Sequence, residues 1–187
     1  YDYFNYTVSD GTDTDIAVLR ITVTGINDAP VAQNDVGVIN EDATLTVSNS
    51  ANANVSGSYD ATGEHSGDVI NTSSSSYTDS DPDDSASLVV SAIRLGGTEG
   101  SGTAGSIGSA LTGTYGQLTI AANGSYSYVA NQSAADDLDA GDSATDVFNY
   151  TLSDGTATDI GTITITVLGL NDPVVATNDT GSVNEDA

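Results

Sequence analysis

The sequence contains no cysteine, no tryptophan and no methionine among its 187 residues. Without cysteine no disulfide can form, and no thiol is left to oxidise outside a cell. The apolar residues are mainly Val, Ile, Leu, Tyr and Ala, set among many Gly, Ser, Thr, Asn and Asp residues. This composition favours strands joined by many turns.

Basic residues are almost absent. Arg20 and Arg94 oppose 27 acidic residues, so the formal net charge is −25. Such a chain cannot replace the counterions of phosphate groups, which excludes nucleic acid and anionic membrane surfaces as partners. No apolar run approaches the ~18 residues of a membrane span, so direct membrane insertion is not expected. The negative charge must be tolerated as self-repulsion or balanced by recruited cations.

Catalytic residue types are also scarce. His65 is the single histidine, which rules out a histidine-rich metal site and a repeated catalytic triad. Paired aspartates could imitate a glycosidase, but that chemistry needs an apolar pocket that raises one pKa. We therefore do not expect an enzyme. The sequence has neither a signal peptide nor an initiator methionine, so we expect targeting signals elsewhere in a longer parent protein.

A long internal repeat organises the chain. Residues 4–43 recur at residues 148–187 without a gap, and 26 of the 40 aligned positions are identical. The offset of 144 residues, from residue 4 to residue 148, suits one domain with its own core. The repeat predicts a tandem array in which residues 1–29 end one unit, 30–173 form a complete unit and 174–187 begin another.

Alternating apolar residues predict strands within the complete unit. Residues 148–153 and 162–168 alternate in this way, and Ser153-Asp154-Gly155-Thr156 between them predicts a hairpin. Residues 117–120 and 125–129 flank Asn123-Gly124, a dipeptide typical of tight hairpin turns. Further strands are expected at 88–95, 44–47 and 68–70, and long loops at 49–67 and 96–114.

About seven strands per repeat, Gly-rich turns and no helical periodicity predict an all-β fold. The expected architecture is an immunoglobulin-like Greek-key β-sandwich, repeated in tandem. Tyr126, Tyr128 and Tyr150 are expected in its core.

Acidic residues cluster along the sequence, and clustered oxygen ligands favour calcium, which takes six to eight of them at ~2.3–2.6 Å. The clusters are Asp79, Asp81, Asp83 and Asp84; Asp136, Asp137, Asp139, Asp142 and Asp146; Asp10, Asp13 and Asp15 with Asp154 and Asp159 in the second copy; and Asn27, Asp28, Asn34, Asp35, Glu41 and Asp42 in the linkers. The run from Asp79 is not an EF-hand, because Asp84 and Val90 replace the required Gly and Glu. A calcium site must therefore combine several loops.

Each acidic cluster also has a purely structural interpretation. Asp79 and Asp81 could serve turns, and Asp154 could accept hydrogen bonds in an Asx-turn. Asp136 and Asp137 are expected to lie in a solvated loop.

Four motifs in order give a family resemblance. They are Gly124-Ser125-Tyr126-Ser127-Tyr128, Leu138-x-x-Gly141, Asp146-x-Phe148-x-Tyr150-x-x-Ser153-Asp154-Gly155 and Gly169-x-Asn171-Asp172. Together they resemble the VCBS repeat, a family of cadherin-like sandwiches in very large bacterial surface and biofilm proteins. The similarity covers most of one repeat and is weakest at residues 49–77.

The resemblance implies calcium at the junctions between consecutive domains. Asn27-Asp28 and Asn171-Asp172 resemble the cadherin linker motif Asp-x-Asn-Asp-Asn. Asp79-x-Asp81 resembles the Asp-x-Asp that follows the second strand, and Asp154 the aspartate before the final strand. These residues would converge at the N-terminal end of the central domain.

At the C-terminal junction, Glu41 resembles the glutamate that ends the first strand, with Asp139 or Asp142 as neighbours. The linkers depart from the motif, because glycine replaces its first aspartate and Ala29 or Pro173 its last asparagine. We therefore expect one or two calcium ions per junction.

These inferences predict a calcium-stabilised structural repeat of a long extracellular filament or adhesin, a stiff extender at the bacterial cell surface. Its partners would be neighbouring repeats of the same chain, which we prefer, or identical subunits that exchange strands in a fibre. The alternative is a binding module that grips a polysaccharide or another surface ligand through the loops at 49–67 and 96–114. Tyr59 is the single aromatic residue in those loops.

Overall fold

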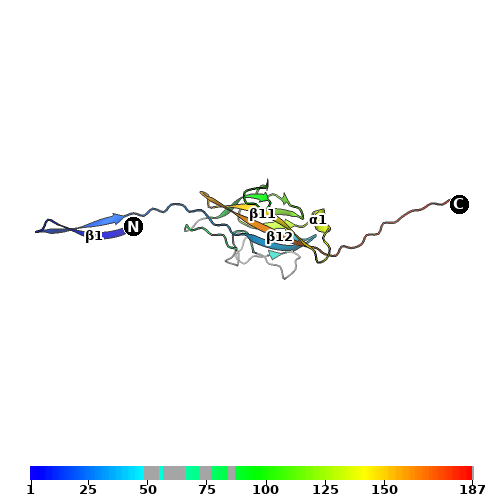
Figure 1. The fold of residues 1–187 in the computed structure, drawn as a ribbon, viewed down its shortest axis with the longest axis horizontal. Coiled ribbons are helices and arrows are strands. Elements are labelled where there is room, and N and C mark those ends of the chain that lie inside the picture. Colours follow the sequence, from blue (N-terminus) through cyan, green and yellow to red (C-terminus); the bar gives the residue numbers. More distant parts are fainter. Residues whose placement is uncertain (49–54, 57–65, 72–76, 84–86, 187) are drawn as a thin grey trace.

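The computed structural model of the protein describes residues 1–48, 55–56, 66–71, 77–83 and 87–186. Three parts follow one another along the chain: a two-stranded hairpin, a β-sandwich and an extended C-terminal segment (Figure 1). Linkers leave the sandwich at its two opposite ends (Figure 1).

Two five-stranded sheets form the sandwich. The first, here called the β12 sheet, has the order β3 (Asp35–Asn40), β12 (Thr158–Leu168), β11 (Ser143–Ser153), β6 (Val89–Leu95) and β7 (Thr103–Ala104). The second, the β10 sheet, has the order β5 (Val55–Ser56), β4 (Thr44–Val47), β10 (Tyr126–Val129), β9 (Gln117–Ile120) and β8 (Leu111–Thr112). Neighbouring strands are antiparallel except β3 and β12, which run parallel.

The core lies between the sheets and follows from the period of two along each strand. Phe148 and Leu152 of β11 are fully buried, as is Leu118 on the facing sheet. The rings of Tyr128 and Phe148 meet edge to face, with centroids 6.4 Å apart. Such pairs add to the stabilisation that burial alone provides. The three tyrosines expected in the core, Tyr126, Tyr128 and Tyr150, are all buried.

The predicted all-β sandwich is confirmed. The described part of the sandwich has seven strands of four or more residues and three two-residue strands, β5, β7 and β8. The predicted strands at 44–47, 88–95, 117–120, 125–129, 148–153 and 162–168 all form, within one residue at most ends. The loop expected at 96–114 contains β7 and β8, and most of the loop expected at 49–67 lies outside the described residues.

Two local predictions are wrong. Residues 68–70 form a bend, because Oδ1 of Asp68 accepts the N–H groups of Ile70 (2.9 Å) and Asn71 (2.6 Å) and turns the chain back. One helical turn, α1 (Ser133–Asp136), was not expected, since four residues are too few for a periodic pattern. Its buried Ala135 packs into the core.

The N-terminal hairpin pairs β1 (Asp2–Ser9) with β2 (Thr14–Ile21). Its register repeats that of β11 and β12: Phe4 faces Leu19 as Phe148 faces Ile163. Phe4 is 52% exposed, whereas its counterpart Phe148 is fully buried. The local sequence therefore sets the register, while burial depends on strands that the hairpin does not contact.

Candidate metal centres

The N-terminal end of the sandwich brings the linker against two loops. The side-chain amide of Asn27 donates to Oδ2 of Asp154 (3.0 Å), in the turn between β11 and β12. The N–H of Asp28 donates to Oδ2 of Asp83 (2.8 Å), in the loop before β6. Three residues proposed from the sequence thus lie together, and Asp83 joins them.

Asp81 lies beside this group. Its Oδ1 accepts the N–H of Asp83 (2.7 Å). Its Oδ2 is buried and has no hydrogen-bond partner among the described residues. A buried carboxylate oxygen without a donor is costly unless a cation or water satisfies it. This orphaned atom makes the loop a suitable place for a cation.

Asp154 forms the Asx-turn considered from the sequence. Its Oδ1 accepts the N–H groups of Thr156 (2.6 Å) and Ala157 (2.7 Å). These bonds, with that of Ala157 foremost and that of Asn27 adding to them, lower the pKa of Asp154. Asp10, its counterpart in the N-terminal hairpin, makes the same turn and also has a lowered pKa. The backbone of the turn therefore binds Oδ1 of Asp154, and Oδ2 of Asp154 faces the linker.

Asp79 lies deeper, in a buried network around Tyr150. Its Oδ1 accepts the N–H of Gln33 (2.7 Å), and the Tyr150 hydroxyl lies 3.3 Å from its Oδ2. That hydroxyl is also 3.0 Å from Oδ2 of Asp35 and 2.8 Å from the Gln33 carbonyl. Burial raises the pKa of Asp35 to about 9 and that of Asp79 to about 7. Burial therefore favours the neutral form of Asp35, whose Oδ1 is buried without a hydrogen-bond partner among the described residues.

The C-terminal end of the sandwich contains Glu41, directly after β3. Glu41 is 2% exposed, and its Oε1 accepts the N–H of Leu170 in the linker that leaves β12. Its Oε2 is buried without a hydrogen-bond partner in the part of the chain that the structure describes. Like Oδ2 of Asp81, this carboxylate oxygen lies at a junction, at the opposite end of the sandwich.

Asp139 and Asp142 lie exposed beside the same linker. The N–H of Asp142 donates to the Asp139 carbonyl (2.8 Å), and the N–H of Gly169 donates to the Asp142 carbonyl (3.0 Å). A cleft of about 430 Å³ lies here, lined in part by Asn40, Asp142 and Leu170. The loop is thus fixed against the linker by backbone bonds, which leaves its carboxylates in solvent.

The second linker repeats a detail of the first. The amide of Asn171 donates to the Asp172 carbonyl (3.1 Å), as the amide of Asn27 donates to the Asp28 carbonyl (2.6 Å). Asn171 and Asp172 are exposed in the extended C-terminal segment.

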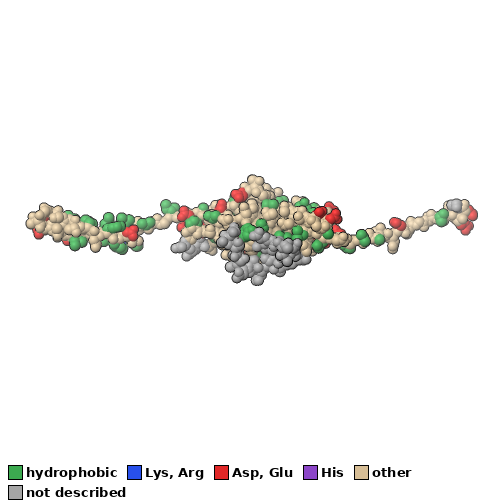
Figure 2. Space-filling model, turned by 60° about the horizontal axis from the view of Figure 1, so that its bottom comes forward, with side chains coloured by type: hydrophobic (Ala, Val, Ile, Leu, Met, Phe, Trp, Pro, Cys, Tyr) green, Lys and Arg blue, Asp and Glu red, His purple; other side chains and the backbone are tan. Residues whose placement is uncertain are grey.

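Acidic side chains gather at both ends of the sandwich (Figure 2). Among the described residues, no group of three or more Asp, Glu or His side chains is arranged to hold a metal ion. Each junction therefore brings oxygen ligands near one another without closing a coordination sphere.

The sequence places Asp83 and Asp159 in acidic clusters but does not assign either of them to a junction. Asp159 lies at the start of β12, and its Oδ2 accepts the N–H of Ala32 in the linker (2.8 Å). The internal repeat contained a signal for it, because Asp15 occupies the same position in the first copy. Asp83 has no counterpart within the chain, so only the folded loop reveals its contact.

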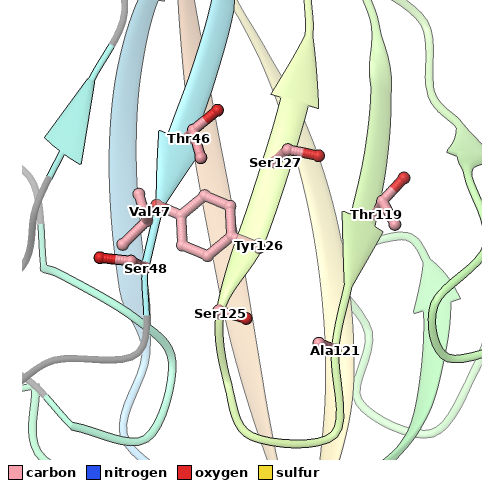
Figure 3. Close-up of a pocket in the computed structure, with 8 residues that line it drawn as sticks. All are labelled: Thr46, Val47, Ser48, Thr119, Ala121, Ser125, Tyr126 and Ser127. Atoms are coloured by element: carbon pink, nitrogen blue, oxygen red, sulfur yellow. The ribbon is translucent and has the colours of Figure 1, made fainter.

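A separate hollow of about 350 Å³ lies on the β10 sheet (Figure 3). Thr46, Ser127 and Thr119 stand side by side across β4, β10 and β9 at its edge. No charged side chain lines the hollow, and the one aromatic residue in it, Tyr126, is buried.

Comparison with known proteins places most of the chain in one family. The sequence profile described as "Bacterial cadherin-like domain" matches residues 27–169, well over half of the chain. No curated protein matches the sequence. Among the described residues, no helix has the length and apolar character needed to cross a membrane.

Among solved structures, the endo-fucoidan hydrolase MfFcnA4 from glycoside hydrolase family 107 is similar to 89% of this chain, at 16% identity and a TM-score of 0.32. The chain spans 19% of that protein. A likeness at this score carries no functional argument.

Proposed function

The chain belongs to the bacterial cadherin-like domain family, and on that premise we propose that it is a structural extracellular repeat whose junctions are stiffened by calcium. Domains of this family are typically non-catalytic and lie outside the cell. We propose no catalytic role for any residue.

One observation carries the proposal. Asp81 Oδ2 and Glu41 Oε2 are buried without hydrogen-bond partners among the described residues, and they lie at opposite junctions. The residues near these two atoms carry carboxylate, amide and carbonyl oxygens, the ligand types that calcium prefers. The residues proposed to hold an ion at the N-terminal junction are Asn27, Asp28, Asp81, Asp83 and Asp154, and at the C-terminal junction Glu41, Asp139 and Asp142, with Asn171 and Asp172 facing the next repeat. Asp79 stays a sequence prediction.

The proposed mechanism couples ion binding to linker rigidity. A bound cation would neutralise part of the −25 charge at the points where carboxylates face one another. Asn27 and Asp28 come from the linker, whereas Asp81 and Asp154 come from sandwich loops. Ligands shared between linker and sandwich would fix the angle at which the chain enters the domain. Without cations, the facing carboxylates repel and the linker bends.

The finer identity is also a proposal. The four motifs and their order support a VCBS-type repeat in a filament or adhesin of the bacterial surface, with a role in adhesion or biofilm. We propose unit boundaries at residues 29 and 173, so that residues 1–29 complete a preceding repeat and 174–187 begin the next. The partners would then be neighbouring repeats of one continuous chain.

The test measures melting temperature and small-angle scattering in calcium and in chelator. We expect calcium to raise the melting temperature and to lengthen the particle. In Asp81→Asn and Glu41→Gln these effects should weaken, whereas the exposed control Asp137→Asn should respond as the wild type does. If calcium changes neither quantity in the wild type, the calcium proposal is wrong.

A second candidate function rests on the hollow in Figure 3. Its hydroxyl groups at Thr46, Thr119 and Ser127 could bind a polysaccharide or another surface glycan through hydrogen bonds. A glycan array on the chain would test this function. Binding that is lost in Ser127→Val would favour it, and an array without signal would remove it.

A further inference from the structure

The two linkers attach to adjacent strands at opposite ends. The N-terminal linker runs into the start of β3, and the C-terminal linker leaves from the end of β12. These strands are parallel neighbours, with six aligned residue pairs from Asp35 and Ile163 to Asn40 and Leu168. Tension along the chain therefore pulls β3 and β12 past each other.

We propose that the β3–β12 pair is a load-bearing clamp against tension along the chain, and that Asn34, Asp159 and Glu41 are the side chains that latch its ends. The load arises from the proposed role as a link in a long repeat array. The clamp itself consists of hydrogen bonds within the chain and does not require calcium.

The direction of load decides how the ladder fails. In a parallel pair the hydrogen bonds are evenly spaced along the strands. When the strands are pulled in opposite directions along their axes, all of these bonds are strained together. Pulling both strands from one end would instead break the bonds one after another. Shear loading therefore raises the barrier to forced unfolding, which is a kinetic property.

Side-chain bonds extend the ladder before β3 begins. Oδ1 of Asn34 accepts both the N–H and the hydroxyl of Thr162, each at 2.9 Å. Oδ2 of Asp159 accepts the N–H of Ala32 at 2.8 Å. These three bonds join β12 to the linker residues directly before β3.

Glu41 closes the other end of the pair. Its N–H donates to the Leu168 carbonyl (2.9 Å), and its Oε1 accepts the N–H of Leu170. Because Glu41 is 2% exposed, water has little access to compete for this bond. The chain leaving β12 is therefore held to the end of β3.

The residue types of the latches recur in the sequence of the flanking copies. Asn178, Glu185 and Asp15 occupy the positions of Asn34, Glu41 and Asp159 at the 144-residue offset. An array built from such units would pass tension from one β3–β12 pair to the next. The β10 sheet would stay outside this load path, because neither linker attaches to it.

Single-molecule force spectroscopy tests the clamp on the whole chain, in chelator. Because the chain has no cysteine, one cysteine added at each end gives two unique handles. We expect Asn34→Ala and Asp159→Ala each to unfold at least tenfold faster than the wild type at the same force. The control Ile120→Val lowers equilibrium stability from the β10 sheet, and it should change the forced unfolding rate less than twofold.

A variant of Glu41 tests the clamp separately from the proposed calcium site. In chelator, Glu41→Ala should unfold faster under force than the wild type, because it removes the acceptor for the N–H of Leu170. Urea unfolding of each variant verifies that it folds. Equal rates under force for the wild type, Asn34→Ala and Asp159→Ala would overturn the clamp, whatever calcium does to the melting temperature.

Discussion

At the scale of single residues, the most unusual group is the buried set of Asp35, Asp79 and Tyr150. Asp35 is 1% exposed, and burial raises its pKa to about 9. In the unfolded chain the same carboxyl titrates near 3.8. The folded protein therefore holds a proton that the unfolded chain releases over most of the physiological range.

This difference predicts that acid stabilises the fold. Below pH ~4 the contribution of Asp35 is fully present, and it is lost as the pH rises towards 9, by up to about 1.4 kcal/mol per pH unit. Asp79, with a pKa of about 7, adds a loss of the same sign that ends near pH 7. The free energy of unfolding, measured with urea in metal-free buffer at pH 5, 7 and 9, should fall at each step.

Asp35→Asn should flatten that pH dependence, because the amide does not titrate. The exposed Asp137→Asn should retain the wild-type slope. If the slopes of Asp35→Asn and the wild type coincide, Asp35 is ionised in the folded protein and the interpretation of the network is wrong.

At the scale of elements, hairpins were the part of the fold most open to prediction. β11–β12 and β9–β10 combine alternating residues with a turn dipeptide, and both signals lie within a few residues. The parallel β3–β12 pair has no such local signal, since its strands lie at opposite ends of the domain sequence. The bend at Asp68 was missed because a side chain captures the backbone there.

Contacts between distant segments also limited the prediction of the candidate site. Asn27 in the linker and Asp154 in the β11–β12 turn each belong to a recognisable motif, so their meeting could be anticipated. The burial of Glu41 and the contact between Asp28 and Asp83 depend on how separate loops pack. The sequence pattern holds no trace of that packing.

Two hairpin turns give a prediction at this scale. Gly124 and Gly155 both have positive φ, 88° and 95°. A Cβ on Gly155 would meet nothing within 4 Å, whereas one on Gly124 would lie 2.9 Å from Oδ1 of Asp68. Gly155→Ala should therefore cost about 1 kcal/mol, from backbone strain alone, and Gly124→Ala about 1–3 kcal/mol more, from the clash. Urea unfolding of the two variants measures the difference, and equal losses would contradict it.

At the scale of the whole molecule, the hairpin lacks the facing sheet that covers the apolar side chains of the sandwich. The hairpin exposes an apolar face that includes Phe4, Tyr6, Val8 and Leu19, each at least half exposed. The equivalent face of β11 and β12 is covered by the β10 sheet. An exposed apolar face of this kind favours association with other molecules.

Deleting residues 1–21 should therefore leave the sandwich intact. We expect a change in melting temperature of less than about 3 °C, the shift that ~1 kcal/mol produces in a chain of this size. Binding of the dye ANS, which reports exposed apolar surface, should fall. A melting temperature many degrees lower would mean that the hairpin stabilises the sandwich in solution.

The parallel pairing of β3 with β12 also orders events during synthesis. β3 is the first strand of the sandwich to leave the ribosome, and its partner is the last. The β12 sheet cannot acquire its β3 edge until the final strand is made, so the contact order is high and closure is slow. The sandwich therefore cannot complete its fold before its last strand has been made.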